Sequence, residues 1–362
     1  MKHTLHSQHV KLAATAVLSL VCAAASAQSS VTIYGAIDIG LLTQSNAPAG
    51  TASTQFATGG ISPSHWGFRG TEDLGGGLKV NFNLESHFTS DTGAAISGPA
   101  AGRIFRRQAN VGFSSASMGS LTLGTQYSPA VLAFGLTDPR GIRENFSGLF
   151  PWVYSSGILA GTNTNNDVGV FMENAISYSK TFGPVGLSVG YSLAEKNLAQ
   201  TGAQLALGAT YSGPVVLSAA YQLTDRANTS DTLSTMASVG AGYTMGDLTA
   251  KLNYFVATNE DASKNDISKV EVLGLGVDWK TASNNTVSAV VYYGKDKLNA
   301  SDKTTSLILT DEYALSKRTT LYATVVMADA DKNASLLTTI VAGGTRADSN
   351  STLFNVGVRH TF

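Results

Sequence analysis

The last twelve residues place the strongest constraint on the fold of this chain. From Phe354 to Phe362, every second residue belongs to one mostly apolar set, and the residues between, Asn355 to Thr361, are polar and include Arg359. Side chains of a strand alternate between its two faces, so the pattern predicts a strand with lipid on one side and water on the other. Lipid cannot satisfy free backbone N–H and C=O groups, so such a strand needs a partner on both edges. We therefore expect the C-terminal strand to close a transmembrane barrel against the first strand.

The other end of the chain has the pattern of a secretory signal. Lys2 and Lys11 precede an apolar run from Leu12 to Ala25, and Ala25-Ser26-Ala27 is a small-x-small cleavage pattern before Gln28. This predicts a signal peptide over residues 1–27 and a barrel over residues 28–362. The one cysteine, Cys22, lies in the predicted signal, so the exported barrel is not expected to rely on disulfides.

Charge and hydropathy narrow the class of protein. The 24 Lys and Arg nearly balance the 25 Asp and Glu, which argues against a general binder of nucleic acid or anionic membranes. After residue 27, no run approaches the roughly 18 apolar residues of a transmembrane helix. Hydrophobic residues make up 43% of the chain, which also suits a barrel in which only half of each strand faces lipid.

Alternating patterns recur along most of the chain and predict an all-β protein. Short turns alternate with longer polar connections, which is the layout of an outer-membrane barrel. Sixteen strands are expected, with both termini at the short-turn rim, and about 16 antiparallel strands enclose a water-filled channel. The predicted strands are 31–42, 65–69, 78–85, 104–113, 121–127, 172–181, 186–194, 203–212, 215–225, 233–244, 248–258, 269–280, 286–295, 304–315, 319–329 and 350–362.

Two segments depart from this regular pattern. In the predicted strand 104–113, Arg107 shares a face with Ala109, Val111 and Phe113, so neither face looks like plain lipid contact. A folded loop or another subunit covering that wall would explain the pattern. Residues 128–169 show no clear periodicity and are much longer than a usual connection, and such loops are typically functional or disordered. The aromatic residues of this loop indicate that it is ordered.

Several motifs, in order, resemble the general diffusion porins of Gram-negative bacteria, especially the betaproteobacterial group. The resemblance covers nearly the whole chain after the predicted signal, and each motif is weak alone. The motifs are Ser30–Gly35, Trp66–Gly75, Arg107–Ala109 with Val111–Phe113, Leu123-Gly124 with Gln126-Tyr127, Tyr313–Thr319 and Val358–Phe362.

The resemblance implies a homotrimer of 16-stranded barrels in the outer membrane, surrounded by outer-membrane lipid. It also implies that the third surface loop, here residues 128–169, folds inward and narrows the pore. Asp138 and Glu144 resemble the acidic positions of that loop. Arg107 resembles a pore arginine on the facing wall, with Arg69 and Lys79 as lesser candidates. Such opposed charges would orient and filter solutes.

Two positions differ from the family pattern, because His65 and Thr125 stand where arginines are usual. Arg140 and Arg143 on the loop could partly replace the missing positive charge. We expect a weak preference for cations at neutral pH, since Asp138 and Glu144 would then face mainly Arg107. Protonation of His65 below about pH 6 would move the preference toward anions.

The C-terminal residue, Phe362, is expected to act in assembly. The resemblance implies that the insertion machinery of the outer membrane reads such a terminal aromatic residue. Deleting Phe362 should therefore leave protein that is secreted but not inserted.

The function predicted from these features is a passive pore for small hydrophilic solutes and ions, with no cofactor and no nucleic-acid partner. The alternative is a substrate-specific outer-membrane channel, although no row of closely spaced aromatic residues suggests a sugar path. An outer-membrane lipase is a third hypothesis, because Gly186–Gly190 fits the pattern G-x-S-x-G around Ser188. That motif needs a strand, a sharp turn and a helix, whereas these residues lie within one predicted strand. His65, His87 and His360 are also far apart in sequence and show no metal-ligand spacing.

Overall fold

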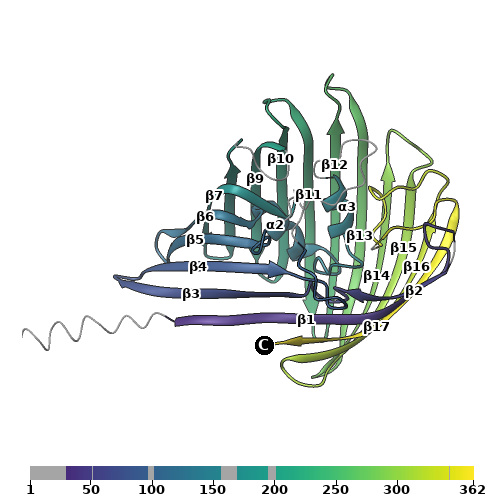
Figure 1. Ribbon diagram of the computed structural model, residues 1–362, viewed down its shortest axis with the longest axis horizontal. Coiled ribbons are helices and arrows are strands. Elements are labelled where there is room, and N and C mark those ends of the chain that lie inside the picture. Colours follow the sequence, from purple (N-terminus) through teal and green to yellow (C-terminus); the bar gives the residue numbers. More distant parts are fainter. Residues whose placement is uncertain (1–29, 51, 97–101, 156–168, 195–200, 342) are drawn as a thin grey trace, which may run out of the picture.

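The strands form one closed antiparallel sheet. The computed structural model describes residues 30–50, 52–96, 102–155, 169–194, 201–341 and 343–362, so the predicted signal peptide lies outside the described residues. Strand β1 (Ser30–Gln44) pairs with β17 (Ser349–Thr361), from Ala36 opposite Thr361 to Gln44 opposite Leu353. This pairing closes the barrel (Figure 1), as the C-terminal pattern predicted.

The remaining strands follow one another around the barrel in chain order. They are β2 (Ser53–Thr58), β3 (His65–Gly75), β4 (Leu78–His87), β5 (Gln108–Ser115), β6 (Gly119–Tyr127), β7 (Phe171–Phe182), β8 (Val185–Ser192), β9 (Thr201–Ser212), β10 (Val215–Arg226), β11 (Thr232–Met245), β12 (Leu248–Glu260), β13 (Asp266–Ala282), β14 (Asn285–Asp296), β15 (Lys303–Ala314) and β16 (Thr319–Ala330).

Two of these strands occupy one position in the wall. β2 pairs with the second half of β1, from Ile39 to Gln44, and β3 pairs with its first half, from Ser30 to Ala36. Residues 59–64 leave the sheet between β2 and β3. The described strands therefore make a 16-position barrel, and the predicted fold class is confirmed.

Side chains alternate between the lipid and the lumen along each strand. On β12, Leu248, Leu252 and Tyr254 are exposed on the outer surface, whereas Asn253 and Phe255 are buried on the inner side. Exposed apolar side chains continue around the outside of the wall, which is the surface that hydrocarbon covers in a membrane barrel. No helix in the described part of the chain is long and apolar enough to cross a membrane.

The C-terminal residue belongs to the outer surface. Phe362 is 44% exposed, its N–H donates to the Gly35 carbonyl at 3.1 Å, and its carbonyl accepts from the Gly35 N–H at 3.2 Å. The ring lies over Gly35, where a Cβ atom would be 2.5 Å from Phe362 Cζ. Phe362 therefore adds one more pair of backbone hydrogen bonds to the closing seam.

The predicted strand 104–113 is wrong at its start. β5 begins at Gln108, and Val111 and Phe113 on it are exposed on the outer surface. Arg107 lies before the strand, so strand alternation does not fix the direction of its side chain. Its guanidinium turns to the Glu85 carboxylate, which lies on the lumen side of β4, and Arg107 is buried.

Two short helices of the loop after β6 lie within the curve of the sheet (Figure 1). Helix α2 (Pro129–Thr137) begins with Ser128 as N-cap and a proline in its first turn, both favourable at a helix start, and it packs against β9 and β10. Helix α3 (Leu149–Ser155) follows, and residues 156–168 of the predicted loop 128–169 lie outside the described residues. The ring of Phe134 stacks on Trp152 with centroids 4.6 Å apart, so the two helices share an apolar core.

Glycines on the lumen face of the wall allow α2 to approach closely. A Cβ atom on Gly208 would lie 2.6 Å from the Pro129 carbonyl oxygen, and one on Gly240 would collide with Thr137 Oγ1. The Thr137 hydroxyl lies 2.6 Å from Ser218 Oγ and accepts from Asn253 Nδ2 at 2.8 Å. The helix is therefore fixed at its C-terminal end directly against the barrel wall.

Candidate constriction site

The pore arginine predicted at Arg107 is part of a cluster on the wall. Its Nε donates to Glu85 Oε1 at 2.6 Å, its Nη2 donates to the Tyr127 hydroxyl, and its guanidinium lies 5.3 Å from the centre of the Phe171 ring. The Tyr34 hydroxyl donates to the second oxygen of Glu85 at 2.7 Å. The charge of Arg107 is thus balanced first by a wall carboxylate, Glu85, and not by an acid of the loop.

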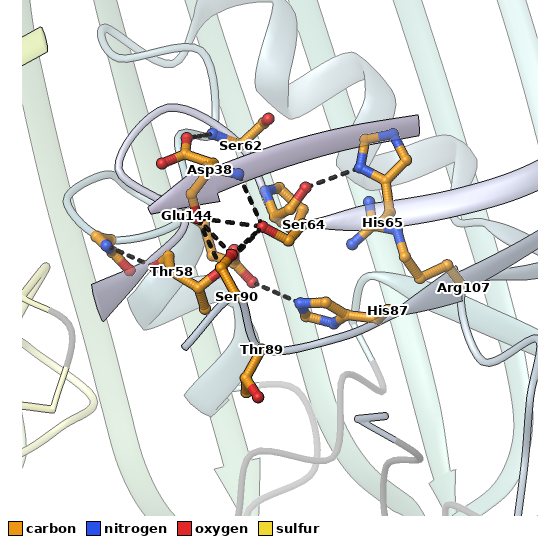
Figure 2. Close-up of polar contacts among 12 residues, drawn as sticks. Asp38, Thr58, Ser62, Ser64, His65, His87, Thr89, Ser90, Arg107 and Glu144 are labelled. Carbon is orange, nitrogen blue, oxygen red and sulfur yellow. Dashed lines mark hydrogen bonds and ion pairs between the residues drawn. The ribbon is translucent and has the colours of Figure 1, made fainter. Parts of the chain in front are cut away.

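Two histidines that are distant in sequence meet beside this cluster. His65 and His87 are directly opposite each other in the β3–β4 pair. His65 Nδ1 lies 2.7 Å from the Pro63 carbonyl oxygen, and His87 Nε2 lies 3.6 Å from Glu144 Oε1 (Figure 2). Glu144 therefore faces His87 on the wall. The strand register brings the two histidines together, and their sequence spacing alone gave no sign of it.

Asp138 does not line the channel, contrary to the expectation. It is 1% exposed, and its carboxylate accepts from the N–H groups of Ile142 at 2.7 Å and Gly148 at 3.2 Å and from the Tyr292 hydroxyl at 2.8 Å. Burial raises the pKa of Asp138, and these hydrogen bonds oppose the rise. Asp138 orders the loop, because backbone donors in a tight loop need an internal acceptor. Its hydrogen bond with Tyr292 also connects the loop to β14.

The two loop arginines lie on the other side of the loop, toward β12–β17. Arg140 is 4% exposed, its Nη1 donates to Thr310 Oγ1 at 2.6 Å, and its backbone N–H donates to the Tyr292 hydroxyl at 3.2 Å. Burial lowers the pKa of Arg140 to about 10, with the charge of Arg143 as the next cause. Arg143 Nη1 lies 2.6 Å from Glu312 Oε1 of β15.

The two lesser wall candidates lie nearer the short-turn rim. The Arg69 guanidinium lies 4.7 Å from the centre of the Tyr34 ring and is exposed within the barrel. Lys79 is exposed opposite Asp73, next to the turn that joins β3 and β4. Lys79 is therefore apart from the cluster around Arg107.

A buried carboxylate on β1 holds a second inward segment. Asp38 accepts from the N–H groups of Ile61 at 2.8 Å and Ser62 at 2.9 Å and from the Tyr322 hydroxyl at 2.8 Å. Figure 2 shows Asp38 beside the hydroxyls of Ser64 and Ser90. Asp38 thus fixes residues 59–64, which leave the sheet between β2 and β3.

Two cavities lie beside the loop, and several of the predicted constriction residues are divided between their linings. The first, of about 420 Å³, is lined by Arg107, Glu85, His65, His87 and Glu144 together with apolar side chains of the loop. The second, of about 270 Å³, is lined by Arg140, Arg143, Lys251, Asp278 and Arg359. Among the described residues, no group of three or more His, Cys, Asp or Glu could hold a metal ion.

The sequence patterns did not identify Glu85, Glu312, Lys251 or Arg359 as candidate constriction residues. A usable signal existed for Lys251 and Arg359, because each lies on the polar set of an alternating strand and must face water inside the barrel. The partners of Arg107 and Arg143 depend on strand register and loop position. Those contacts join residues far apart in the chain.

Comparison with known proteins gives a consistent result. The sequence model of the family described as Gram-negative porin matches residues 14–333. Outer membrane porin protein 32 of Delftia acidovorans is 32% identical over 370 residues, covering 97% of this chain and 99% of that protein. The anion-selective porin from Comamonas acidovorans has a TM-score of 0.79 and 27% identity, covering 92% of this chain and 100% of that one. The trimer form of OmpT from Vibrio cholerae has a TM-score of 0.68 at 18% identity over 92% of this chain and 99% of that one, a likeness of fold.

Proposed function

The chain belongs to the family of Gram-negative porins, and from this premise we propose that its pore favours small anions over cations. It is an integral outer-membrane porin, a water-filled barrel for passive diffusion of small hydrophilic solutes and ions. The observation that carries the proposed preference is the group of cations around the second cavity, where Arg140 and Arg143 of the loop face Lys251 and Arg359 of the wall.

The carboxylates near the loop offset only part of this positive charge, although Asp278 also lines the cavity. Glu85 is paired with Arg107, and Glu312 is paired with Arg143. Asp138 and Asp38 are buried against backbone N–H groups. The weak cation preference expected from the sequence assumed that Asp138 faces the channel, and its burial removes that assumption.

The similarity to a porin described as anion-selective points in the same direction. That structure shares 27% identity with this chain over nearly its whole length. Charged rings and clusters in a narrow pore set ion preference by raising the local concentration of counter-ions.

The test is the zero-current potential of the purified protein in planar bilayers across a KCl gradient at pH 7. We expect a zero-current potential whose sign shows that chloride permeates faster than potassium. A potential of the opposite sign would overturn the proposed preference, and folded protein without conductance would overturn the channel itself.

We propose further that the working unit is a homotrimer, exported with removal of residues 1–27. β3, β4 and β5 contain only 11, 10 and 8 residues, against 12 to 17 in β10 to β16, so this part of the wall has less height to span lipid. Trp66, Phe68 and Phe105 form an aromatic cluster there, and contact with a second copy would cover such a short apolar wall. Conductance that appears in groups of three equal steps, and a mature N-terminus at Gln28, are the expected results.

The proposed function involves no catalysis. Gly186–Gly190 lies within β8, and the Ser188 hydroxyl donates to the Gly208 carbonyl at 3.3 Å. The sharp strand-to-helix turn of a hydrolase is therefore not formed at this serine.

A further inference from the structure

The cationic side chains that line the second cavity could bind an anion as well as let it pass. We propose that it is a discrete site for a small oxyanion of the phosphate or carboxylate type, so that these anions cross the pore by saturable binding. The inference rests on the proposed anion preference and adds a chemical class and a location to it.

Arg140 is the buried charge of this site. Its Nε and Nη2 are buried and have no hydrogen-bond partner among the described residues, and its Nη1 bonds only to the neutral hydroxyl of Thr310. Arginine stays charged in proteins, and a buried charge that forms no direct ion pair is costly. A negative charge drawn into the adjoining cavity would reduce that cost.

The other three cations lie at the edges of the cavity and remain partly open to it. Lys251 projects from β12, and Arg359 projects from β17 with its Nε donating to Ser62 Oγ at 2.7 Å. Arg143 is 28% exposed and keeps its ion pair with Glu312. These side chains come from three separate elements, and an anion between them would meet positive charge from each.

The acidic groups leave a net positive charge. Asp278 also lines the cavity, where its Oδ1 accepts from the Ser288 hydroxyl at 2.6 Å, and Glu312 neutralises Arg143. Arg140, Lys251 and Arg359 then stand against Asp278 in the lining and the buried Asp138 nearby, which leaves an excess of one positive charge. This excess favours an anion, and an anion with two charges most of all.

The type of donor favours oxyanions over chloride. Guanidinium groups present paired N–H donors that match two oxygens of a carboxylate or phosphate, whereas a spherical halide has no pair of oxygens to match this geometry. Ser288 adds a hydroxyl to the lining of this cavity. A cavity of about 270 Å³ has room for a phosphate with several waters, since a water occupies roughly 30 Å³ of liquid.

The experiment measures inhibition of the KCl current by inorganic phosphate in planar bilayers at pH 7. The full-length mature protein is used, and sulfate and succinate are tested as further oxyanions. We expect saturable inhibition by phosphate, and Arg140→Gln should weaken the apparent affinity by about tenfold, as expected for one lost charge-assisted interaction. Arg69→Gln is the matched control, because it removes the same charge from the barrel interior outside this cavity, and it should change the affinity less than about twofold.

The outcomes separate the inference from the function on which it rests. A chloride-preferring channel whose current phosphate does not saturably reduce would overturn the binding site and leave the proposed function intact. An equal effect of Arg69→Gln and Arg140→Gln would also overturn it, because only total charge would then matter. If Arg140→Gln fails to fold, Lys251→Gln and Arg359→Gln on the wall provide the same comparison.

Discussion

At the scale of single residues, the difference between Asp138 and Glu144 shows why charge alone does not identify a pore residue. Both are acids of the same loop, yet Asp138 accepts hydrogen bonds from two loop N–H groups and Tyr292, whereas Glu144 faces His87 beside the first cavity. Whether each carboxylate is buried or faces the cavity depends on which backbone N–H groups of the folded loop lie within hydrogen-bond distance of it.

Asp138→Ala should loosen the loop while the barrel stays closed. The change leaves the part-buried N–H of Ile142 and the buried N–H of Gly148 without an acceptor, a loss of up to about 1–3 kcal/mol for each unsatisfied group. We expect larger fluctuations of the open-channel current and faster proteolysis within residues 138–148. Asp261→Ala is the control, since Asp261 accepts from the N–H groups of Ser263 and Asn265 in an exposed loop. If Asp138→Ala behaves like Asp261→Ala, Asp138 is not what orders the loop.

Substitutions of Glu85 and of Arg107 should change the ion preference of the pore in opposite directions. Glu85→Gln removes the carboxylate that balances Arg107 and should raise the chloride-to-potassium permeability ratio. Arg107→Gln leaves Glu85 unbalanced and should lower that ratio. A unit charge at about 4 Å is worth about 1 kcal/mol in water, so each change should reach up to about fivefold. Shifts in the same direction would show that the pair does not act on passing ions.

The pH dependence expected of His65 stays a prediction. His65 lines the first cavity with Glu85, Arg107, His87 and Glu144. Its partial burial and the charges of Arg107 and Arg359 oppose its protonation, whereas the charge of Glu85 favours it. Protonation adds positive charge, so acid should move the zero-current potential toward chloride between about pH 8 and pH 5. His65→Ala should lose most of this shift, and His65→Arg should prefer anions most at neutral pH. Identical titration of the wild type and His65→Ala would exclude His65 as the switch.

At the scale of elements, the position of α2 depends on the absence of a side chain at Gly240. Gly240→Ala would place a Cβ atom against Thr137, so the end of the helix must move off the wall and into the lumen. We expect lower single-channel conductance and reduced thermal stability of the folded protein. Gly242→Ala is matched in strand and face, but its Cβ atom would have no neighbour closer than 3.6 Å and should be tolerated. Equal conductance in the two variants would contradict this role for Gly240.

The strands could be predicted from sequence much better than the contacts between them. Alternation in β12 to β17 is regular because lipid and water impose opposite demands on the two faces. It failed near Arg107, where the chain is not yet a strand, and it did not reveal that β2 and β3 share one position against β1. The exit of residues 59–64 depends on Asp38 accepting from Ile61 and Ser62, a contact between segments distant in sequence that leaves no periodic signal.

At the scale of the whole molecule, separate loops are joined inside the barrel. Phe146 of the loop after β6 forms an isolated β-bridge with Val341 of the loop before β17, and both residues are buried. The loop before β17 also lies close to β14, where a Cβ atom on Gly294 would collide with the Thr338 carbonyl oxygen. Such contacts lie more than 40 residues apart in the chain, and they explain why the site could be predicted only in part from sequence.

The closing seam gives two distinct reasons why Phe362 could matter. Its backbone adds a pair of hydrogen bonds with Gly35, and its ring lies over Gly35 on the outer surface, where insertion machinery could read it. Deletion of Phe362 removes both features, whereas Phe362→Ala keeps the backbone bonds and removes only the ring.

If the ring is an assembly signal, both variants should be secreted and fail to insert, with a large loss of folded protein in the outer membrane. If the backbone seam is what matters, only the deletion should fail, because lipid leaves its unpaired groups without partners. Phe182→Ala is the matched control, since Phe182 is an exposed outer-surface aromatic residue at the end of β7, away from the seam. The measurement is the amount of folded barrel in outer-membrane fractions, and a normal yield of Phe362→Ala would exclude the ring as the signal.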